Sequence, residues 1–386
     1  MAPRPDALRP HYQRFLAPGR VLLTGHSHQA WPDVAWQGVE RALEDAATHA
    51  DDKWGPAFEA ADAVRAAVAR WVGGRPEQVA LAINTHELVC RFLSALDLRA
   101  RPHLVTTTGE FHSITRQLRR LDEQGLVQVT FVPAEPVATL ADRLGAAVTE
   151  RTAAVLASTV LFETSSVVPG LPALVARARG LGAEVLLDAY HAFGVLPFTL
   201  DTLGARDAFL VGGGYKYAQW GEGNCFLVVP PREFRPVLTG WFAGFGHLSQ
   251  RQDGVGYGPS GAEAFAGSTY DPVSHYRARA VIEFFQAQGL TAEALREISL
   301  RQTQRLLDGL LGLELATPSA PEARAGFVAV RAPDAPALAK ALAAGGILTD
   351  ARGDRLRLGP APYLLDAELD RGVEAVRRLL ARRGGA

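Results

Sequence analysis

A lysine inside an apolar, glycine-rich stretch is the residue whose surroundings most clearly indicate chemistry. Lys216 stands between two tyrosines in VGGGYKYAQWGEGNCFLVV, residues 211–229. A lysine is ordinarily a solvated surface group, but a desolvated amine loses its charge readily, and the neutral amine is the form that attacks a carbonyl carbon. The stretch therefore predicts a lysine that captures carbonyl compounds.

Polar and aromatic side chains also follow three other apolar runs. These side chains are Asp188 and His191, Phe111 and His112, and Asn84, Thr85 and His86. A carboxylate ending a buried strand must be paired, an aromatic ring can lie on a flat ligand, and the N–H groups that open a helix can hold a phosphate. Each feature alone also fits an ordinary structural role. Together with Lys216, they describe partners for the pyridine nitrogen, ring, phosphate and aldehyde of pyridoxal phosphate.

The elements that must position these residues indicate an α/β protein. Between residues 78 and 230, short runs rich in Val or Leu mostly alternate with helical stretches, which is typical of a mostly parallel sheet with helices on both faces. There are seven such runs: QVALAIN, HLVTTT, VQVTFVP, AAVLAST, EVLLDA, AFLVGG and CFLVVP. Ligands of such sheets bind at the carboxyl ends of the strands, where the candidate residues stand.

The 386 residues are too many for one ordinary core and suit a large domain with a smaller one. We expect an N-terminal segment at residues 1–50 that packs with the small domain, a large cofactor-binding domain at 51–270, and a small C-terminal α+β domain at 271–386. The last boundary lies where long helices and a few strand-like runs replace the earlier alternation.

Composition argues against several partners. Forty Lys and Arg against 41 Asp and Glu leave a net charge of −1, so no overall field favours nucleic acid or an anionic membrane. The N-terminal residues lack a hydrophobic signal core and no apolar run is long enough to span a membrane, which predicts a cytoplasmic protein. The two cysteines, Cys90 and Cys225, lie in apolar segments and are expected to be buried free thiols.

Two of these stretches resemble a known family. LLDAYHAFGVLP at 186–197 and DAFLVGGGYKYAQWGEGNCFLVV at 207–229 are similar to the Asp-x-x-His and Tyr-Lys-Tyr motifs of kynureninases, in the class V branch of fold-type I pyridoxal-phosphate enzymes. The resemblance continues through LLTGHSHQAWP, TGWFAGFGH, FAGSTYDP and GILTDARGDRLRLGPAPY. It implies the fold-type I transferase fold, pyridoxal 5'-phosphate as cofactor, and a homodimer with shared active sites.

The resemblance also implies roles for individual residues. Lys216 would be the Schiff-base lysine and the base, Asp188 the partner of the pyridine nitrogen, and Tyr215 a phosphate ligand and late proton donor. Arg357 would pair with the substrate α-carboxylate, and His28 would border the substrate. The expected cofactor-binding residues are Lys216, Asp188, His191, Tyr215, Thr85, His86 and Phe111, joined across the dimer by Trp241 and Thr269.

The implied reaction is hydrolytic cleavage of the β–γ carbon bond of kynurenine, which gives anthranilate and alanine. Three stretches depart from the kynureninase pattern. GHSHQ at 25–29 replaces Asn-Ser-Leu-Gly, AQWGEG at 218–223 replaces Asn-Gly-Gly-Pro-Gly, and FHSI at 111–114 replaces Phe-Pro-Thr-Asp. The first two are expected to border the substrate pocket, so substrate choice is where this chain should differ.

Other functions remain open at this point. A class V aminotransferase, or another lyase or epimerase, would use Lys216 and Asp188 on a different amino acid. A cysteine desulfurase needs a cysteine on a mobile loop, whereas Cys90 is expected in a helix and Cys225 in a buried strand.

Outside this class, His26 and His28 stand at alternate positions of an expected strand and could be two metal ligands. A metal hydrolase would need a third ligand beside them, such as His247 or His112, but none stands at a recognisable spacing, and no metal is expected. A non-catalytic binding protein would leave Lys216 without a purpose.

Overall fold

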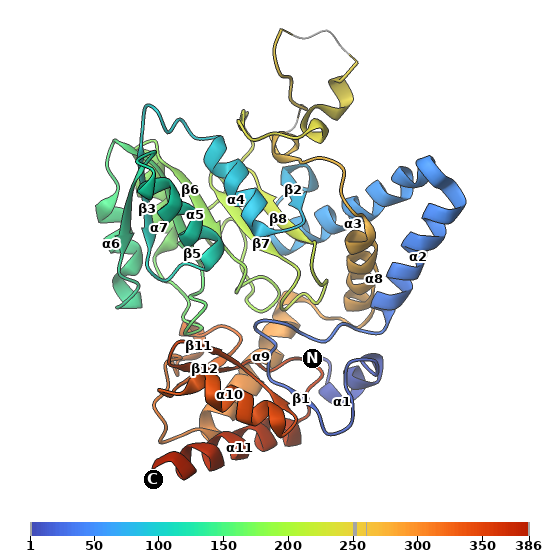
Figure 1. Cartoon of the computed structure of the whole chain (residues 1–386), viewed down its shortest axis with the longest axis vertical. Helices are drawn as coiled ribbons and strands as arrows, with labels where there is room; N and C mark the ends of the chain where they lie inside the picture. Colours follow the sequence, from blue (N-terminus) through green and yellow to red (C-terminus); the bar gives the residue numbers. More distant parts are fainter. Residues whose placement is uncertain (1, 250–252, 260, 385–386) are drawn as a thin grey trace.

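A seven-stranded, mostly parallel sheet forms the centre of the computed structural model, which describes residues 2–249, 253–259 and 261–384 (Figure 1). Its strands in spatial order are β2 (Val79–Ala82), β8 (Cys225–Val228), β7 (Phe209–Gly213), β6 (Glu184–Asp188), β5 (Thr152–Ser158), β3 (His103–Thr107) and β4 (Gln128–Val132). β8 runs antiparallel to both of its neighbours, and the other pairs are parallel. The sheet confirms the α/β prediction, and its strands are the seven apolar runs.

Helices cover both faces of this sheet because strand residues alternate between two apolar cores. Leu186 lies in one core, and its neighbours Val185 and Leu187 lie in the other. The first core includes α4 (Thr85–Ser94) and α5 (His112–Glu123). The second includes α3 (Trp54–Val72), α6 (Leu140–Ala147) and α7 (Leu171–Gly180).

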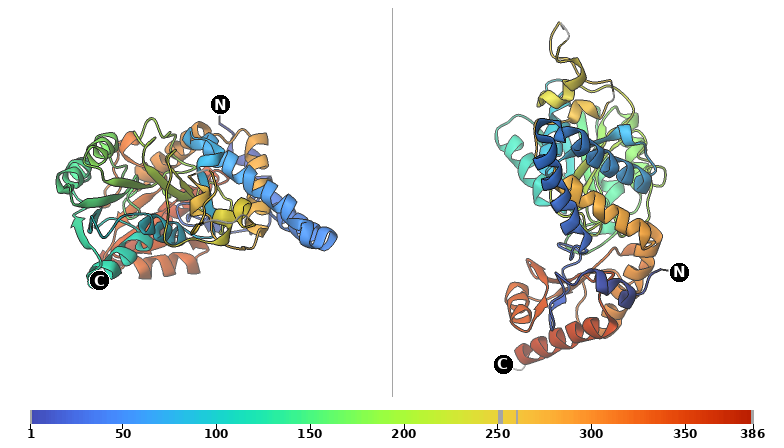
Figure 2. Two further views of the ribbon diagram at one scale, coloured as in Figure 1. Left: turned by 90° about the horizontal axis from the view of Figure 1, so that it is seen from above. Right: turned by 90° about the vertical axis from the view of Figure 1, so that its right-hand side faces the viewer.

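A smaller lobe lies below the sheet in Figure 1, and Figure 2 shows the two lobes from the side. Its antiparallel sheet has the order β11 (Asp350–Arg352), β12 (Arg355–Leu358) and β9 (Val328–Arg331). Its helices are α9 (Ala292–Gly309), α10 (Ala335–Ala344) and α11 (Asp366–Gly384).

The N-terminal segment divides between the two lobes. After the short helix α1 (Pro5–Leu8), β1 (Val21–Leu22) pairs in parallel with β10 (Ile347–Leu348) of the smaller lobe. By contrast, α2 (Val34–His49) packs against α8 (Val273–Ala287). The division of the chain at residues 50 and 270 stays a prediction.

The carboxyl ends of the parallel strands face the smaller lobe. After β5, the carbonyl of Phe162 reaches Arg357 of β12, and after β6, His191 lies against Phe327 next to β9. This is the edge at which open α/β sheets bind ligands.

Among the described residues, no helix combines the length and the apolar character needed to cross a membrane.

Residues 25–27 form a turn, whereas the sequence suggested a strand carrying His26 and His28. β1 already ends at Leu22, and the N–H groups of Ser27 and His28 both donate to the carbonyl of Thr24. These bonds close the turn, so the two histidines do not alternate along a strand.

Candidate active site

The glycines before Lys216 make room for aromatic rings of the chain itself. A Cβ on Gly213 would lie 2.6 Å from the Tyr190 hydroxyl, and one on Gly214 would lie 2.1 Å from the Trp220 ring. A residue larger than glycine would push these rings away. The glycine run at the end of β7 therefore lets Lys216 lie against packed aromatic rings.

The amine of Lys216 lies among His191, Tyr190 and Phe111. Nζ is 2.5 Å from His191 Nε2, 4.9 Å from the centre of the Tyr190 ring and 5.5 Å from that of Phe111. Burial lowers the pKa of Lys216 to about 7, while the charge of Asp188 acts in the opposite direction. A substantial fraction of the amine is therefore neutral at neutral pH.

Asp188 is the last residue of β6, and His191 stands on the turn that follows it. Oδ1 of Asp188 accepts a hydrogen bond from the N–H of Tyr190 at 2.7 Å. Burial raises the pKa of Asp188, and that bond and Lys216 oppose the rise. Burial and then the charge of Lys216 hold the pKa of His191 well below its usual value, so the ring is neutral. Its Nδ1 is buried and has no hydrogen-bond partner within the described chain.

The start of α4 carries the residues expected at a phosphate. Asn84 caps the helix by accepting from the N–H of Glu87 at 2.9 Å. The Thr85 hydroxyl and the Tyr190 hydroxyl each lie 3.6 Å from Sγ of Cys225, which joins the helix start to the floor of the lysine site. His86 is exposed and lies 3.6 Å from Cys90 instead.

Glu110, directly before Phe111, is a buried acid beside this site that the sequence analysis missed. Its two oxygens bond to the N–H and the hydroxyl of Ser158, each at 2.7 Å. Burial raises the pKa of Glu110 to about 8, and the charge of Asp188 adds to the rise. The bonds tie the loop that carries Phe111 to the end of β5.

On the facing lobe, Arg357 is buried and partly occupied. Its Nη2 pairs with the carboxylate of Asp350, and its Nη1 donates to the carbonyl of Phe162 at 2.5 Å. Its Nε is buried without a hydrogen-bond partner in the described chain. Asp350 was missed in the sequence, although a hairpin turning at ARGDR places it opposite Arg357 in the β11–β12 register.

His26 and His28 lie at the same junction of the two lobes. His26 is fully buried, with its ring 4.6 Å from Phe327 and its Nε2 3.6 Å from Asp350. Burial and then the charge of Arg357 lower the pKa of His26 to about 3, so it is neutral. His28 meets Tyr215 edge-on, with ring centres 5.6 Å apart.

Trp241 and Thr269 are not brought to the lysine within this chain. Both are exposed, and Trp241 packs on Phe242 and Phe245 of its own segment. Neither makes a hydrogen bond, ion pair or ring contact with Lys216 in the ranges that the structure describes. Those ranges also hold no group of three or more His, Cys, Asp or Glu placed to bind a metal ion.

The residues around Lys216 fit pyridoxal phosphate. The cofactor needs an amine that is readily neutral, an acid, a flat surface and N–H groups for a phosphate, and these are found at Lys216, Asp188, Phe111 and the start of α4. His191 Nδ1 is buried and has no hydrogen-bond partner among the described residues, and a bound polar group would supply one.

The chain resembles known proteins over nearly its whole length. A family model described as the kynureninase C-terminal domain matches residues 292–376. A kynureninase from Deinococcus radiodurans is 29% identical over 97% of this chain and 94% of its own length. An isopenicillin N epimerase from Streptomyces clavuligerus is 28% identical over 81% of this chain and 82% of its own. Among solved structures, a C-DES mutant with glycine covalently linked to the PLP cofactor has a TM-score of 0.81 at 18% identity, covering 95% of this chain and 98% of that one.

The fold is that of the fold-type I enzymes that depend on pyridoxal phosphate. More narrowly, the sequence comparisons show similarity to kynureninases, through the C-terminal domain model and through relatives such as those at 29% and 23% identity, which confirms the resemblance found in the sequence. Pyridoxal phosphate is the cofactor linked to glycine in the C-DES mutant, and the residues around Lys216 fit the same cofactor.

Proposed function

We propose that this enzyme hydrolyses the β–γ carbon bond of an aryl-ketone amino acid and converts L-kynurenine into anthranilate and alanine. The observation that carries the proposal is the position of Lys216, whose amine lies beside His191 and between Phe111 and Tyr190 and faces the lobe that holds Arg357. The kynureninase relatives support the choice of reaction within the class.

The cofactor, when bound, supplies an aldehyde that captures the substrate amine and a ring that accepts electrons from the α-carbon. Lys216 Nζ, once free, takes the α-proton, and its pKa of about 7 suits a base at neutral pH. Asp188 provides a buried negative charge that keeps a facing pyridine nitrogen protonated. Phe111 holds a flat ring in place.

Substrate is positioned from the opposite side. Arg357 binds the α-carboxylate through its Nε–H, which lacks a hydrogen-bond partner among the described residues, while Phe162 and Asp350 hold its two other nitrogens. Tyr215 donates a proton in the late steps, and His28 beside it borders the substrate side chain. Thr85, His86 and Tyr215 bind the phosphate.

We further propose that the enzyme acts as a homodimer and that Trp241 and Thr269 reach the phosphate of the partner's site. Residues 237–249 extend from the large lobe in yellow at the top of Figure 1 and expose large apolar side chains, including Val237 at 82% and Phe245 at 52%. Beside them, Thr269 lines a cleft of 1270 Å³. Such exposed apolar surface favours an interface.

The test is to mix the cofactor-loaded enzyme with L-kynurenine and to follow alanine, anthranilate and the cofactor absorption together. Alanine that forms in step with anthranilate, with the starting spectrum restored after each turnover, is the expected result. An unchanged spectrum without products would overturn the proposal.

The second candidate is a class V aminotransferase, epimerase or lyase that acts on another amino acid. The 28% identity to an isopenicillin N epimerase and the altered stretches at 25–29 and 218–223 favour it. An aminotransferase leaves the cofactor as the amine, and an epimerase inverts the α-carbon and releases the epimer without breaking a carbon–carbon bond, so spectra and chiral chromatography separate these outcomes. Desulfurase chemistry is disfavoured because Cys90 lies in α4 and Cys225 in β8.

A further inference from the structure

Two stretches that depart from the kynureninase pattern, residues 25–29 and 218–223, are joined in the buried interior. Gln219 Nε2 donates to Gln29 Oε1 at 2.7 Å, and the side chains are 0% and 2% exposed. The Tyr12 hydroxyl donates to Gln219 Oε1 at 2.7 Å, and Gln29 Nε2 donates to the carbonyl of Gly25 at 3.2 Å. We call this series, Tyr12–Gln219–Gln29–Gly25, the amide chain.

The amide chain runs in one direction, with each side-chain oxygen accepting one bond and each side-chain nitrogen donating one. In a buried network, hydrogen bonds are stronger than in water, and removing one member leaves the next donor or acceptor unsatisfied. Gln29 and Gln219 therefore depend on each other, although they are far apart in the sequence.

One end of the amide chain is fixed to the lysine loop. The N–H of Gln219 donates to the carbonyl of Lys216 at 3.1 Å, and the N–H of Trp220 donates to that of Gly214 at 2.8 Å. Gln219 has a φ of 61°, a left-handed conformation that few residues other than glycine adopt. Its side-chain bonds to Tyr12 and Gln29 hold it there.

The other end of the amide chain is fixed at Gly25, in the turn that packs against the segment after Arg357. A Cβ on Gly25 would lie 2.2 Å from the carbonyl oxygen of Pro360, and one on Gly359 would lie 2.2 Å from His26 Nδ1, so this turn sits tightly against the segment after Arg357. His28, next to Gln29, stacks on Trp31 with ring centres 5.8 Å apart. The amide chain thus sets the separation between Lys216 and the turn that carries His26.

We propose that Gln29 and Gln219 act as one specificity-determining pair, which holds His26 and His28 at a fixed distance from Lys216 so that the two altered stretches select the substrate side chain together. This inference rests on the proposed function only in that the site binds an amino acid. Neither glutamine touches the reacting atoms, so both are positioning residues.

The test uses the cofactor-loaded enzyme and two amino acids that lack a γ-carbonyl for water to attack, L-alanine and L-phenylalanine. Gln29→Met and Gln219→Met remove the bond between the two side chains while conserving volume. Each is expected to weaken L-phenylalanine binding by about tenfold, measured from the cofactor absorption, and to leave L-alanine binding within about twofold. The double variant should bind L-phenylalanine no more weakly than either single variant, because the two residues share one function.

Controls separate this inference from a folding defect and from the proposed function. Gln13→Ala removes an exposed glutamine beside Tyr12 and should change neither affinity. Tyr12→Phe should have a smaller effect than Gln219→Met, and circular dichroism should show the native fold for every variant. Losses of affinity that add in the double variant, or that are equal for both amino acids, would overturn the proposal that Gln29 and Gln219 act as one pair. A wild-type spectrum that no amino acid changes would overturn the proposed function instead.

Discussion

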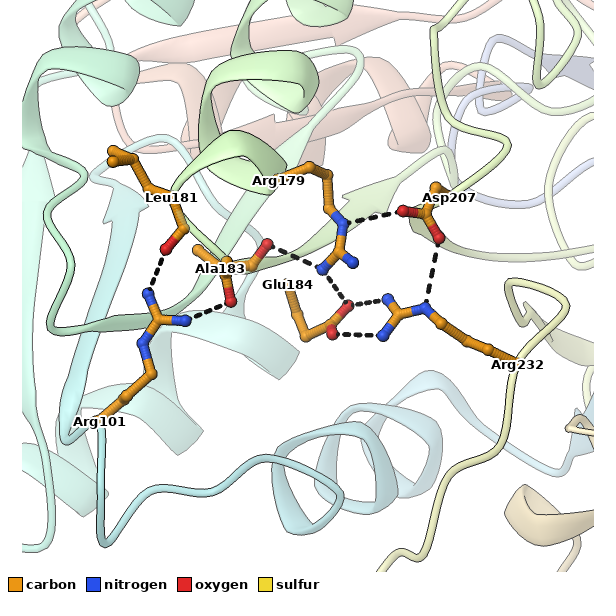
Figure 3. Close-up of polar contacts among 8 residues, drawn as sticks. Arg101, Arg179, Leu181, Ala183, Glu184, Asp207 and Arg232 are labelled. Atoms are coloured by element: carbon orange, nitrogen blue, oxygen red, sulfur yellow. Dashed lines mark hydrogen bonds and ion pairs between the residues drawn. The ribbon is translucent and has the colours of Figure 1, made fainter.

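The two ends of strand β6 each carry an acid, and their surroundings are opposite. At the amino end, Glu184 accepts from Arg232 at 2.8 and 2.5 Å and pairs with Arg179 at 3.0 Å, while Asp207 bonds to both arginines (Figure 3). At the carboxyl end, the carboxylate of Asp188 accepts from one backbone N–H, and burial raises its pKa.

This contrast separates a structural acid from a functional one on a single strand. Paired charges around Glu184 neutralise one another and tie the strand start to neighbouring loops. A buried acid with few partners and a raised pKa costs stability. Such groups, especially with a lysine nearby, therefore mark sites of chemistry. The same holds for His191 Nδ1 and Arg357 Nε, which are buried near that edge and have no hydrogen-bond partner in the part of the chain that the structure describes.

The largest effect is expected from Lys216→Ala, which removes the group around which the carboxyl edge is arranged. Turnover should fall by about 10³-fold or more because both the nucleophile and the base are lost. Borohydride treatment followed by mass spectrometry should find no cofactor attached to the variant. A trapped adduct in the variant would show that another lysine binds the cofactor covalently. It would contradict the assignment of the carboxyl end of β6 as the site of chemistry.

Asp188→Asn tests the comparison directly, with Glu184→Gln as its matched control on the same strand. We expect Asp188→Asn to lower turnover by about 10²-fold, because a buried charge is lost where charge develops. Glu184→Gln should leave turnover within about twofold and instead lower the free energy of unfolding by about 1–2 kcal/mol. Steady-state kinetics and urea unfolding measure the two properties, and the reverse pattern would contradict the assignment.

The effect expected at Glu110 is on the pH dependence of stability rather than on turnover. Its pKa is about 8 in the folded chain against an ordinary 4.5, so the folded state holds this proton more tightly. Its contribution to stability is complete below pH 4.5 and is lost as the pH rises to about 8. Glu110→Gln keeps the bonds to Ser158 and should remove this decline, by at most about 1.4 kcal/mol per pH unit. Urea unfolding between pH 5 and 8 measures it, and unchanged curves would refute the shift.

The local parts of this architecture could be predicted from the sequence. The seven strands, the main helices and the placement of Lys216 and Asp188 at strand ends follow from apolar periodicity, which depends on residues close in the chain. Contacts between the lobes could not be predicted in this way. The bond between Gln29 and Gln219 and the approach of Phe162 to Arg357 depend on how distant segments fold back.

Two further differences have local causes. Tyr190, between Asp188 and His191, was not among the predicted site residues, yet its ring lies under Lys216 because Gly213 leaves it space. His26 and His28 looked like alternate positions of a strand, but backbone bonds to Thr24 turn the chain there.

The pairing of β1 with β10 has a consequence for synthesis. Val21 and Leu22 are made early, and their partners Ile347 and Leu348 are among the last strand residues to emerge. The seven-stranded sheet needs no residue after Val228, so it can form while the ribosome is still at work. The smaller lobe, and with it the junction that holds Arg357 and His26, must wait for nearly the whole chain, so an unfinished chain has no completed active site.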